Sequence, residues 1–171
     1  MNPTIRRITS AILMALLLTT WYGSETVYAK EKGSDTDLAT EIENDPQLTT
    51  LAYLIETAGL LDTLEGTGPY VLFAPTNAAF DKVSESVRSE LIKKENQAQL
   101  EDVLLYHLYP RKQVALEGGK PQKLVMLNGK EAMITRNGKD IKINDSTIQI
   151  SGKPLSNGTL YKIDQVLKPE G

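Results

Sequence analysis

Residues 68–80 have the sequence GPYVLFAPTNAAF, which combines a turn, a strand and the start of a helix in one short segment. Gly68 and Pro69 favour a turn, because Gly accepts unusual backbone dihedral angles and Pro fixes its own. The apolar run over residues 70–74 is rich in aromatic and branched side chains and predicts a buried strand. Pro75 has no N–H to donate to a sheet, so we expect the strand to end there.

A helix is predicted to follow this strand directly. Thr76 and Asn77 are both good N-cap residues, since their side chains can accept hydrogen bonds from the unpaired N–H groups of a first helical turn. We expect one of them to cap a helix that contains Phe80, and we expect Phe73 and Phe80 to be buried. We therefore interpret the segment as a buried scaffold junction.

The first 29 residues have the features of a secretory signal peptide. Arg6 and Arg7 give a positive start, residues 8–18 are mostly apolar, and residues 27–29 form a small-x-small cleavage pattern. We predict cleavage after Ala29 and a secreted or periplasmic protein without stable membrane insertion. A retained N-terminal anchor is the alternative.

The mature chain is predicted to consist of a flexible linker over residues 30–36 and one domain over residues 37–169. Removal of residues 1–29 changes the count from 19 basic and 22 acidic residues to 17 and 21, a net charge of −4. This charge argues against nucleic acid as a partner. The chain has no Cys, which excludes a disulfide framework, a thiolate metal site and a Cys nucleophile.

The domain begins with helical patterns and continues with strand patterns. The predicted helices are one from Asp37 to before Pro46, one over residues 48–64 with a break at Gly59, one containing Val87, Leu91 and Ile92, and one over residues 97–109 closed by Pro110. The predicted strands cover residues 114–116, 123–127, 131–135, 141–143, 147–150 and 160–164, with Asn-Gly turns at 128–129, 137–138 and 157–158. Helices followed by antiparallel strands predict an α+β domain, with the strand at 70–74 inserted early.

Three motifs resemble those of the fasciclin (FAS1) family, in the family's order. Residues 73–77 (FAPTN) with Ala79-Phe80 match the first motif. Residues 104–108 (LLYHL) resemble the second, a Tyr-His pair near the end of a buried helix, and residues 157–169 (NGTLYKIDQVLKP) match the closing motif. The resemblance implies a FAS1 fold, in which helices pack on a mainly antiparallel β-wedge. It also implies extracellular adhesion or ligand binding without catalysis.

Most residues of the first and last motifs are expected to be structural. Asp164 follows an apolar strand, so its carboxylate is expected to accept hydrogen bonds from backbone or hydroxyl groups. The residues predicted to have structural roles are Phe73, Pro75, Thr76, Asn77, Phe80, Asn157, Gly158 and Asp164.

Four residues are candidates for binding. His107 is the only histidine and has two interpretations: a core residue hydrogen-bonded to the backbone, or, with Tyr106, part of a binding surface as proposed for this motif in the family. Lys153 and Leu155 correspond to the short segment through which animal family members bind integrins. Pro154 stands where that segment has Asp, which argues against integrin-type binding.

The sequence contains no signature of an enzyme. One His cannot form a His-rich metal site, no Gly-x-Ser-x-Gly elbow occurs, and Gly118-Gly119 lacks the Lys-Ser/Thr of a phosphate loop. We therefore predict no catalysis, no metal and no cofactor.

Two functional hypotheses remain. The first is an adhesion module that binds an extracellular or cell-surface protein or glycan. The second is a soluble carrier of a small apolar ligand such as a pigment. An apolar surface groove would favour the carrier, and a flat polar surface would favour adhesion.

Overall fold

The computed structural model describes residues 35–114, 120–149 and 152–169. The predicted signal peptide, most of the predicted linker and most of the predicted strand at 114–116 lie outside the described residues. Asp35 and Thr36 at the end of the linker are described, and the Thr36 carbonyl accepts a hydrogen bond from the Ser156 N–H.

The described chain is an α+β domain. Its helices are α1 (Leu38–Asn44), α2 (Thr49–Ala58), α3 (Leu61–Glu65), α4 (Asn77–Asp81), α5 (Glu85–Leu91), a 3-10 turn (Lys94–Asn96) and α6 (Gln97–Leu105). Its strands are β1 (Tyr70–Pro75), β2 (Leu108–Tyr109), β3 (Gln122–Val125), β4 (Glu131–Asn137), β5 (Asp140–Ile143), β6 (Ser146–Ile148), β7 (Lys153–Leu155) and β8 (Gly158–Ile163). The fold class predicted from the sequence is confirmed.

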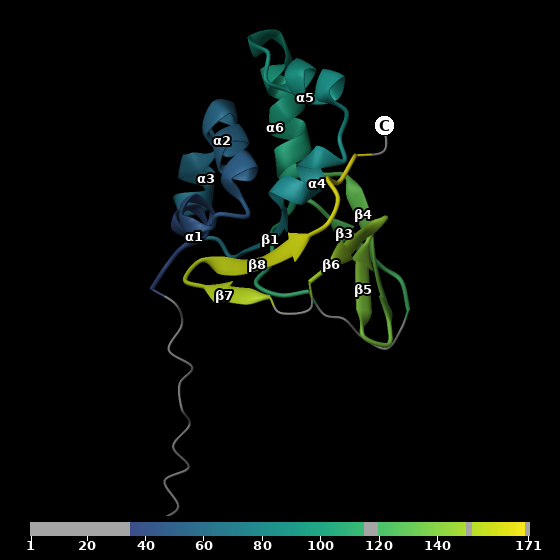
Figure 1. The fold of residues 1–171 in the computed structure, drawn as a ribbon. Coiled ribbons are helices and arrows are strands. Elements are labelled where there is room, and N and C mark those ends of the chain that lie inside the picture. The colour runs from purple at the N-terminus through teal and green to yellow at the C-terminus, as the bar shows by residue number, and fades with distance from the viewer. Residues whose placement is uncertain (1–34, 115–119, 150–151, 170–171) are drawn as a thin grey trace, which may run out of the picture. The chain divides into compact units, whose positions relative to one another are not determined.

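The strand β1 lies between the helices and the hairpin strands (Figure 1). The sheet runs in the order β2-β1-β8-β6-β5-β4-β3, with β7 paired to β8. All pairs are antiparallel except β1 with β8, which are parallel from Tyr70↔Gly158 to Pro75↔Ile163. The first and last family motifs are therefore neighbours in one sheet.

The apolar run of β1 is buried on both faces, because alternate side chains enter two different cores. Leu72 and Ala74 join the core beneath the helices. Val71 and Phe73 join the core enclosed by the hairpin strands, where Phe73 stacks on Tyr161 with ring centroids 6.1 Å apart. A strand that serves two cores has no face for polar residues, which explains its continuous apolar sequence.

The junction after β1 connects this strand to α4 and also links α4 to α2. Thr76 caps α4, with its hydroxyl accepting from the Ala79 N–H at 3.3 Å. Asn77 instead serves α2: its Oδ1 accepts from the Thr50 N–H at 3.0 Å, and its Nδ2 donates to the Pro46 carbonyl at 3.0 Å. The predicted burial of Phe73 and Phe80 is confirmed.

The predicted end of the helix at 97–109 is wrong. The helix α6 ends at Leu105, and Leu108-Tyr109 form β2, which pairs with Val71 and Leu72 of β1. The apolar sequence continues through both elements, but the last residues gain sheet hydrogen bonds that a helix could not provide. By contrast, the break at Gly59 is confirmed, since this residue ends α2 with a φ of 72°.

The sheet also contains two features that the sequence did not indicate. The short strand β7 was not predicted, and the parallel pairing of β1 with β8 links residues almost ninety positions apart. The predicted helix forms as α5 and contains Val87 and Leu91, but it ends one residue before Ile92. It contains no buried residue, and Val87 and Ile92 are exposed.

Candidate ligand-binding groove

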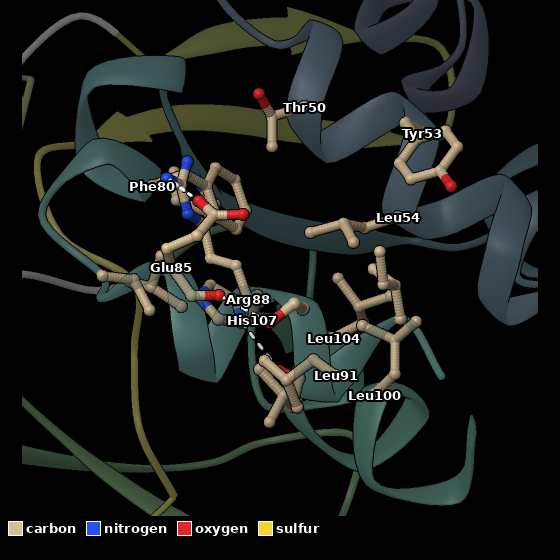
Figure 2. Close-up of a pocket in the computed structure, with 16 residues that line it drawn as sticks. Thr50, Tyr53, Leu54, Phe80, Glu85, Arg88, Leu91, Leu100, Leu104 and His107 are labelled. Carbon is tan, nitrogen blue, oxygen red and sulfur yellow. Dashed lines mark hydrogen bonds and ion pairs between the residues drawn. The ribbon is translucent and has the colours of Figure 1, made fainter. Parts of the chain in front are cut away.

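A cavity of about 200 Å³ lies among α2, α4, α5 and α6 (Figure 2). Its walls are mainly apolar, and the side chains that form most of them are Leu54, Phe80, Leu91, Leu100, Val103 and Leu104. Leu54 comes from α2, Phe80 from α4 and Leu91 from α5, so no single segment of the sequence marks the site. We call this cavity the helical groove.

The groove exists because α5 does not close onto the core. The side chains of Leu100 and Leu104 on α6 and of Leu54 on α2 are buried. Leu91 on α5 is only partly buried, and Ile92 after it is exposed. The apolar side of α5 therefore borders the cavity instead of filling it.

Large apolar side chains also mark the rim of the groove. Tyr53 is 56% exposed and Ile92 is 42% exposed, and both line the cavity. Exposed apolar side chains that border a concave apolar site are typical of a place where a ligand or partner binds.

The polar part of the wall includes an ion-paired arginine, in addition to Thr50, Ser89 and His107. Arg88 Nη2 lies 2.5 Å from Glu85 Oε2, and Nη1 lies 3.6 Å from Asp81 Oδ1. A dashed line joins Arg88 to Glu85 in Figure 2. Among the described residues, Arg88 Nε is the one buried side-chain nitrogen or oxygen without a hydrogen-bond partner.

His107 lies in the wall of the groove, but both of its ring nitrogens are already used. Nε2 accepts from the Leu167 N–H at 3.0 Å, so Nδ1 carries the proton and donates to the Val103 carbonyl at 2.7 Å. Burial lowers the pKa of His107 to about 4, against the opposing effect of the Val103 carbonyl. The ring is therefore neutral near pH 7, as the core interpretation expects.

Tyr106 faces the other core. Its hydroxyl donates to the Glu131 carbonyl at 2.8 Å and accepts from Asn144 Nδ2 at 3.1 Å. Both members of the Tyr106-His107 pair are 1% exposed. The pair holds α6 against neighbouring segments from inside, and its role in binding stays a prediction.

The other two candidate residues are not part of the groove. Lys153 Nζ lies 2.6 Å from Glu41 Oε2, an ion pair that connects β7 with α1. Leu155 is buried in the core beneath the helices. A role for Lys153 and Leu155 in binding also stays a prediction, and the structure does not bring them together with His107 around one cavity.

The closing motif supplies a buried polar connection. Asn157 Oδ1 accepts from the Leu38 N–H at 3.0 Å, and its Nδ2 donates to the Leu64 and Gly66 carbonyls at 2.6 and 2.9 Å. A Cβ on Gly158 would lie 2.1 Å from the Tyr70 carbonyl oxygen, so only Gly allows this close approach of β8 to β1.

Asp164 accepts hydrogen bonds as predicted. Its Oδ1 receives the Thr147 N–H at 2.7 Å and the Ser146 hydroxyl at 3.2 Å. Burial by itself would raise the pKa of Asp164, but the hydrogen bond from Thr147 and the charge of Lys82 lower it below its usual value.

The described residues show no group of three or more His, Cys, Asp or Glu side chains placed to hold a metal ion. In the same part of the chain, no helix has the length and apolar character needed to cross a membrane.

The sequence matches the Fasciclin domain over residues 46–169, and the chain belongs to this family. It is 34% identical over 145 residues to immunogenic protein MPB70 of Mycobacterium bovis, covering 80% of this chain and 70% of that protein. It is 32% identical over 141 residues to cell surface glycolipoprotein MPB83 of the same species, covering 77% and 60%. Protein sll1483 of Synechocystis is 31% identical over 120 residues, covering 70% and 66%.

The fold also matches a solved structure of a FAS1 domain pair from the insect cell adhesion molecule Fasciclin I. The TM-score is 0.69 at 16% sequence identity, and the match covers 80% of this chain and 52% of that one. This chain therefore spans about half the length of the domain pair. The similarity confirms the FAS1 fold that the sequence motifs predicted.

The sequence did not indicate that several of these residues line a groove. Tyr53 lies off the apolar face of α2, and Leu91 and Ile92 were predicted only as part of a helix with Val87. Arg88, between them in the sequence, is one of many charged residues there. The one sequence feature that pointed to the groove is that α5 is short and has too few apolar residues to be buried.

Proposed function

We propose that this chain is an exported, non-catalytic binding protein that carries a small apolar ligand in the helical groove. The observation that supports this function is the apolar cavity of about 200 Å³ with exposed Tyr53 and Ile92 at its rim. An apolar groove was the feature expected to favour a carrier over an adhesion module.

The size and lining of the groove fit a compact ligand. An apolar cavity of about 150 Å³ is large enough to bind benzene. Drug-sized ligands usually occupy cavities of about 300–1,000 Å³. The groove would therefore hold a single ring or a short chain, or the end of a longer molecule that leaves past Tyr53.

The proposal is tested by titrating the chain from Lys30 with ethylbenzene while recording amide NMR shifts. Leu91→Trp fills the groove from α5 and should weaken binding by at least tenfold. Val87→Trp is the matched control, because Val87 lies on the same helix, is exposed and does not line the groove. Shifts that do not saturate in the wild type, or equal binding by both variants, would exclude the groove as the site.

Adhesion is the second candidate function. Two observations favour it: MPB83 is called a cell surface glycolipoprotein, and the solved structural match is an insect cell adhesion molecule. The partner would be an extracellular or cell-surface protein or glycan, and nucleic acid is not expected. Retention of the purified chain by intact cells, undiminished in Leu91→Trp, would favour adhesion through another surface.

Export depends on residues 1–29. We propose that they are a signal peptide cleaved after Ala29 and that the mature protein is secreted or periplasmic. Intact-mass analysis of the exported protein should give Lys30 as the first residue. Recovery of uncleaved chain in the membrane fraction would exclude this processing.

A further inference from the structure

Charge is distributed unevenly between the helical part and the strand part of the chain. Residues 37–109, which contain the helices of the described chain, have 4 basic and 13 acidic side chains, a net charge of −9. Residues 110–169, which contain β3 to β8, have 11 basic and 5 acidic side chains, a net charge of +6. Figure 1 shows β4 and β5 on the opposite side of β1 from α1, α2 and α3. The domain therefore has an acidic helical side and a basic strand side.

The exposed face of β3, β4 and β5 combines basic and apolar side chains. Alternate residues of these strands enter a core, so the residues between them face outward. The inward residues are Leu124, Ala132, Ile134, Ile141 and Ile143. On the outward side, Lys123 lies opposite Met133, and Lys142 lies opposite Thr135. Val125 is 54% exposed and Met133 is 36% exposed. We call the outward side of these three strands the outer sheet face.

The cations of the outer sheet face are poorly neutralised within the protein. Lys142, and Lys139 in the turn before it, form no ion pair with a described residue, whereas Lys123 pairs with Glu131 at 2.7 Å. Other lysines of the strand part are neutralised by carboxylates of the helical part: Lys130, Lys153 and Lys162. From residue 120 to residue 142 the chain has 6 basic and 2 acidic side chains. The outer sheet face therefore presents positive charge to groups outside the protein.

We propose that the outer sheet face binds the surface of a membrane that contains anionic lipids. Lys139 and Lys142 then lie near the lipid phosphates, while Val125 and Met133 contact the apolar layer beneath the headgroups. A lipid surface provides both negative charge and apolar contact, whereas a soluble anionic glycan provides mainly the charge. The attachment is peripheral and needs no helix that crosses the membrane.

The acidic helical side does not prevent this attachment. At about 0.1 M salt, exposed charges more than about 10 Å apart are largely screened from one another. The charges that decide binding are therefore those of the face in contact with the lipid, even though the mature chain has a net charge of −4.

This inference goes beyond the carrier function and does not depend on it. The groove is lined by residues between Thr50 and His107 and by Val166, none of which belongs to the outer sheet face. A chain attached through the outer sheet face would therefore keep its groove free for a ligand.

Co-sedimentation of the chain from Lys30 with vesicles tests the charge requirement. At about 0.1 M salt, vesicles of phosphatidylcholine with an equal part of phosphatidylglycerol should bind the chain about tenfold or more tightly than phosphatidylcholine alone. Lys142→Gln should weaken binding to the anionic vesicles by about fivefold, the effect of one basic side chain near such a surface. Lys94→Gln is the matched control, because Lys94 is also exposed and without an ion pair but lies in the helical part. It should change binding by less than about twofold.

A second pair of variants tests the apolar requirement. Val125→Thr keeps the shape and strand preference of Val but adds a hydroxyl, so it should weaken binding to the anionic vesicles by about threefold or more. Its binding to soluble dextran sulfate should equal that of the wild type. Val87→Thr is the control, because Val87 is 47% exposed and lies on α5.

Each contrary outcome has a defined meaning. Absence of binding to the anionic vesicles, or equal binding to both kinds of vesicle, would overturn the inference. Equal losses in Lys142→Gln and Lys94→Gln would exclude the outer sheet face as the site. Binding to dextran sulfate as tight as that to the vesicles, with Val125→Thr without effect on either, would make an anionic glycan the partner in place of a membrane. None of these results changes the carrier function, which is measured by ethylbenzene binding.

Discussion

Replacement of Asn157 by Ala tests how the helices are attached to the sheet. The Asn157 amide connects the start of α1, the end of α3 and the turn before β8. Truncation to Ala leaves the Leu38 N–H and the Leu64 and Gly66 carbonyls without this partner. We expect a large loss of stability, because two of these three hydrogen bonds are buried.

The magnitude follows from those two buried groups. A buried donor or acceptor left without a partner costs about 1–3 kcal/mol, and Gly66 is accessible enough for water to replace the amide. Two such groups give about 2–6 kcal/mol, which is the expected loss in the free energy of unfolding of Asn157→Ala. This is a large share of the roughly 5–15 kcal/mol that stabilises a typical domain.

Urea unfolding followed by far-UV circular dichroism measures this loss, since the only Trp is Trp21 in the predicted signal peptide. Asn96→Ala is the control: its amide donates to the Glu90 carbonyl near the surface, and its loss should change stability by about 0.5 kcal/mol or less. Asn157→Asp keeps the shape but places a buried charge against two carbonyls, so it should destabilise at least as much as Ala. A loss below about 1 kcal/mol for Asn157→Ala would refute the assigned role of this network.

Three further changes have defined outcomes. The pKa of His107 is about 4 in the folded protein and 6.5 for the free side chain, so the unfolded chain takes up the proton first as the pH falls. The contribution of neutral His107 to the free energy of unfolding should be complete above pH 6.5 and should fall by about 3 kcal/mol as the pH drops to 4. In urea unfolding, His107→Gln should show a weaker dependence of this free energy on pH. Phe80→Ala should cost about 3–5 kcal/mol and Thr76→Ala about 0.5–2 kcal/mol, and the reverse order in urea unfolding would contradict the core and capping roles. Gly158→Ala forces a Cβ against the Tyr70 carbonyl, so calorimetry should show a Tm lower by about 5 °C or more.

The parts of the fold that the sequence predicted correctly depend on local signals. The strand β1, the Gly59 break and the Thr76 cap are each determined by residues within a few positions of one another. The family motifs added the overall architecture, because they carry information on long-range packing that local patterns lack. The structural role of Asp164 also followed from its position after an apolar strand.

The errors occurred where long-range contacts decide between local alternatives. Leu108 and Tyr109 continue the apolar pattern of α6, yet they form β2 because the edge of β1 is available to them. Asn157 does lie in a hairpin turn, between β7 and β8, but its amide also bonds to residues 119, 93 and 91 positions away, which the turn pattern did not indicate. No periodicity within a short window contains such partners.

The helical groove was not predicted for a related reason: an apolar residue on a helix indicates burial but not what buries it. Leu91 and Ile92 have the spacing of a core face, and only the packing of α5 shows that this face borders a cavity. Arg88 carried no signal either, because a charged residue on a short helix is normally solvated. Only the structure shows that its Nε is the one buried side-chain nitrogen or oxygen of the described residues without a hydrogen-bond partner.

The groove has two kinds of wall: core residues such as Leu54, Phe80 and Leu104 form its inner side, and α5 forms its outer side. The two cores are closed by β1, by its parallel pairing with β8 and by the Asn157 network, none of which involves α5. Since α5 contains no buried residue, its side chains can change with little effect on the free energy of unfolding. The residues that hold the scaffold are those of the family motifs, and the residues that border the groove lie largely between them. In the proposed carrier function, ligand preference can therefore vary through α5 while the motifs stay fixed.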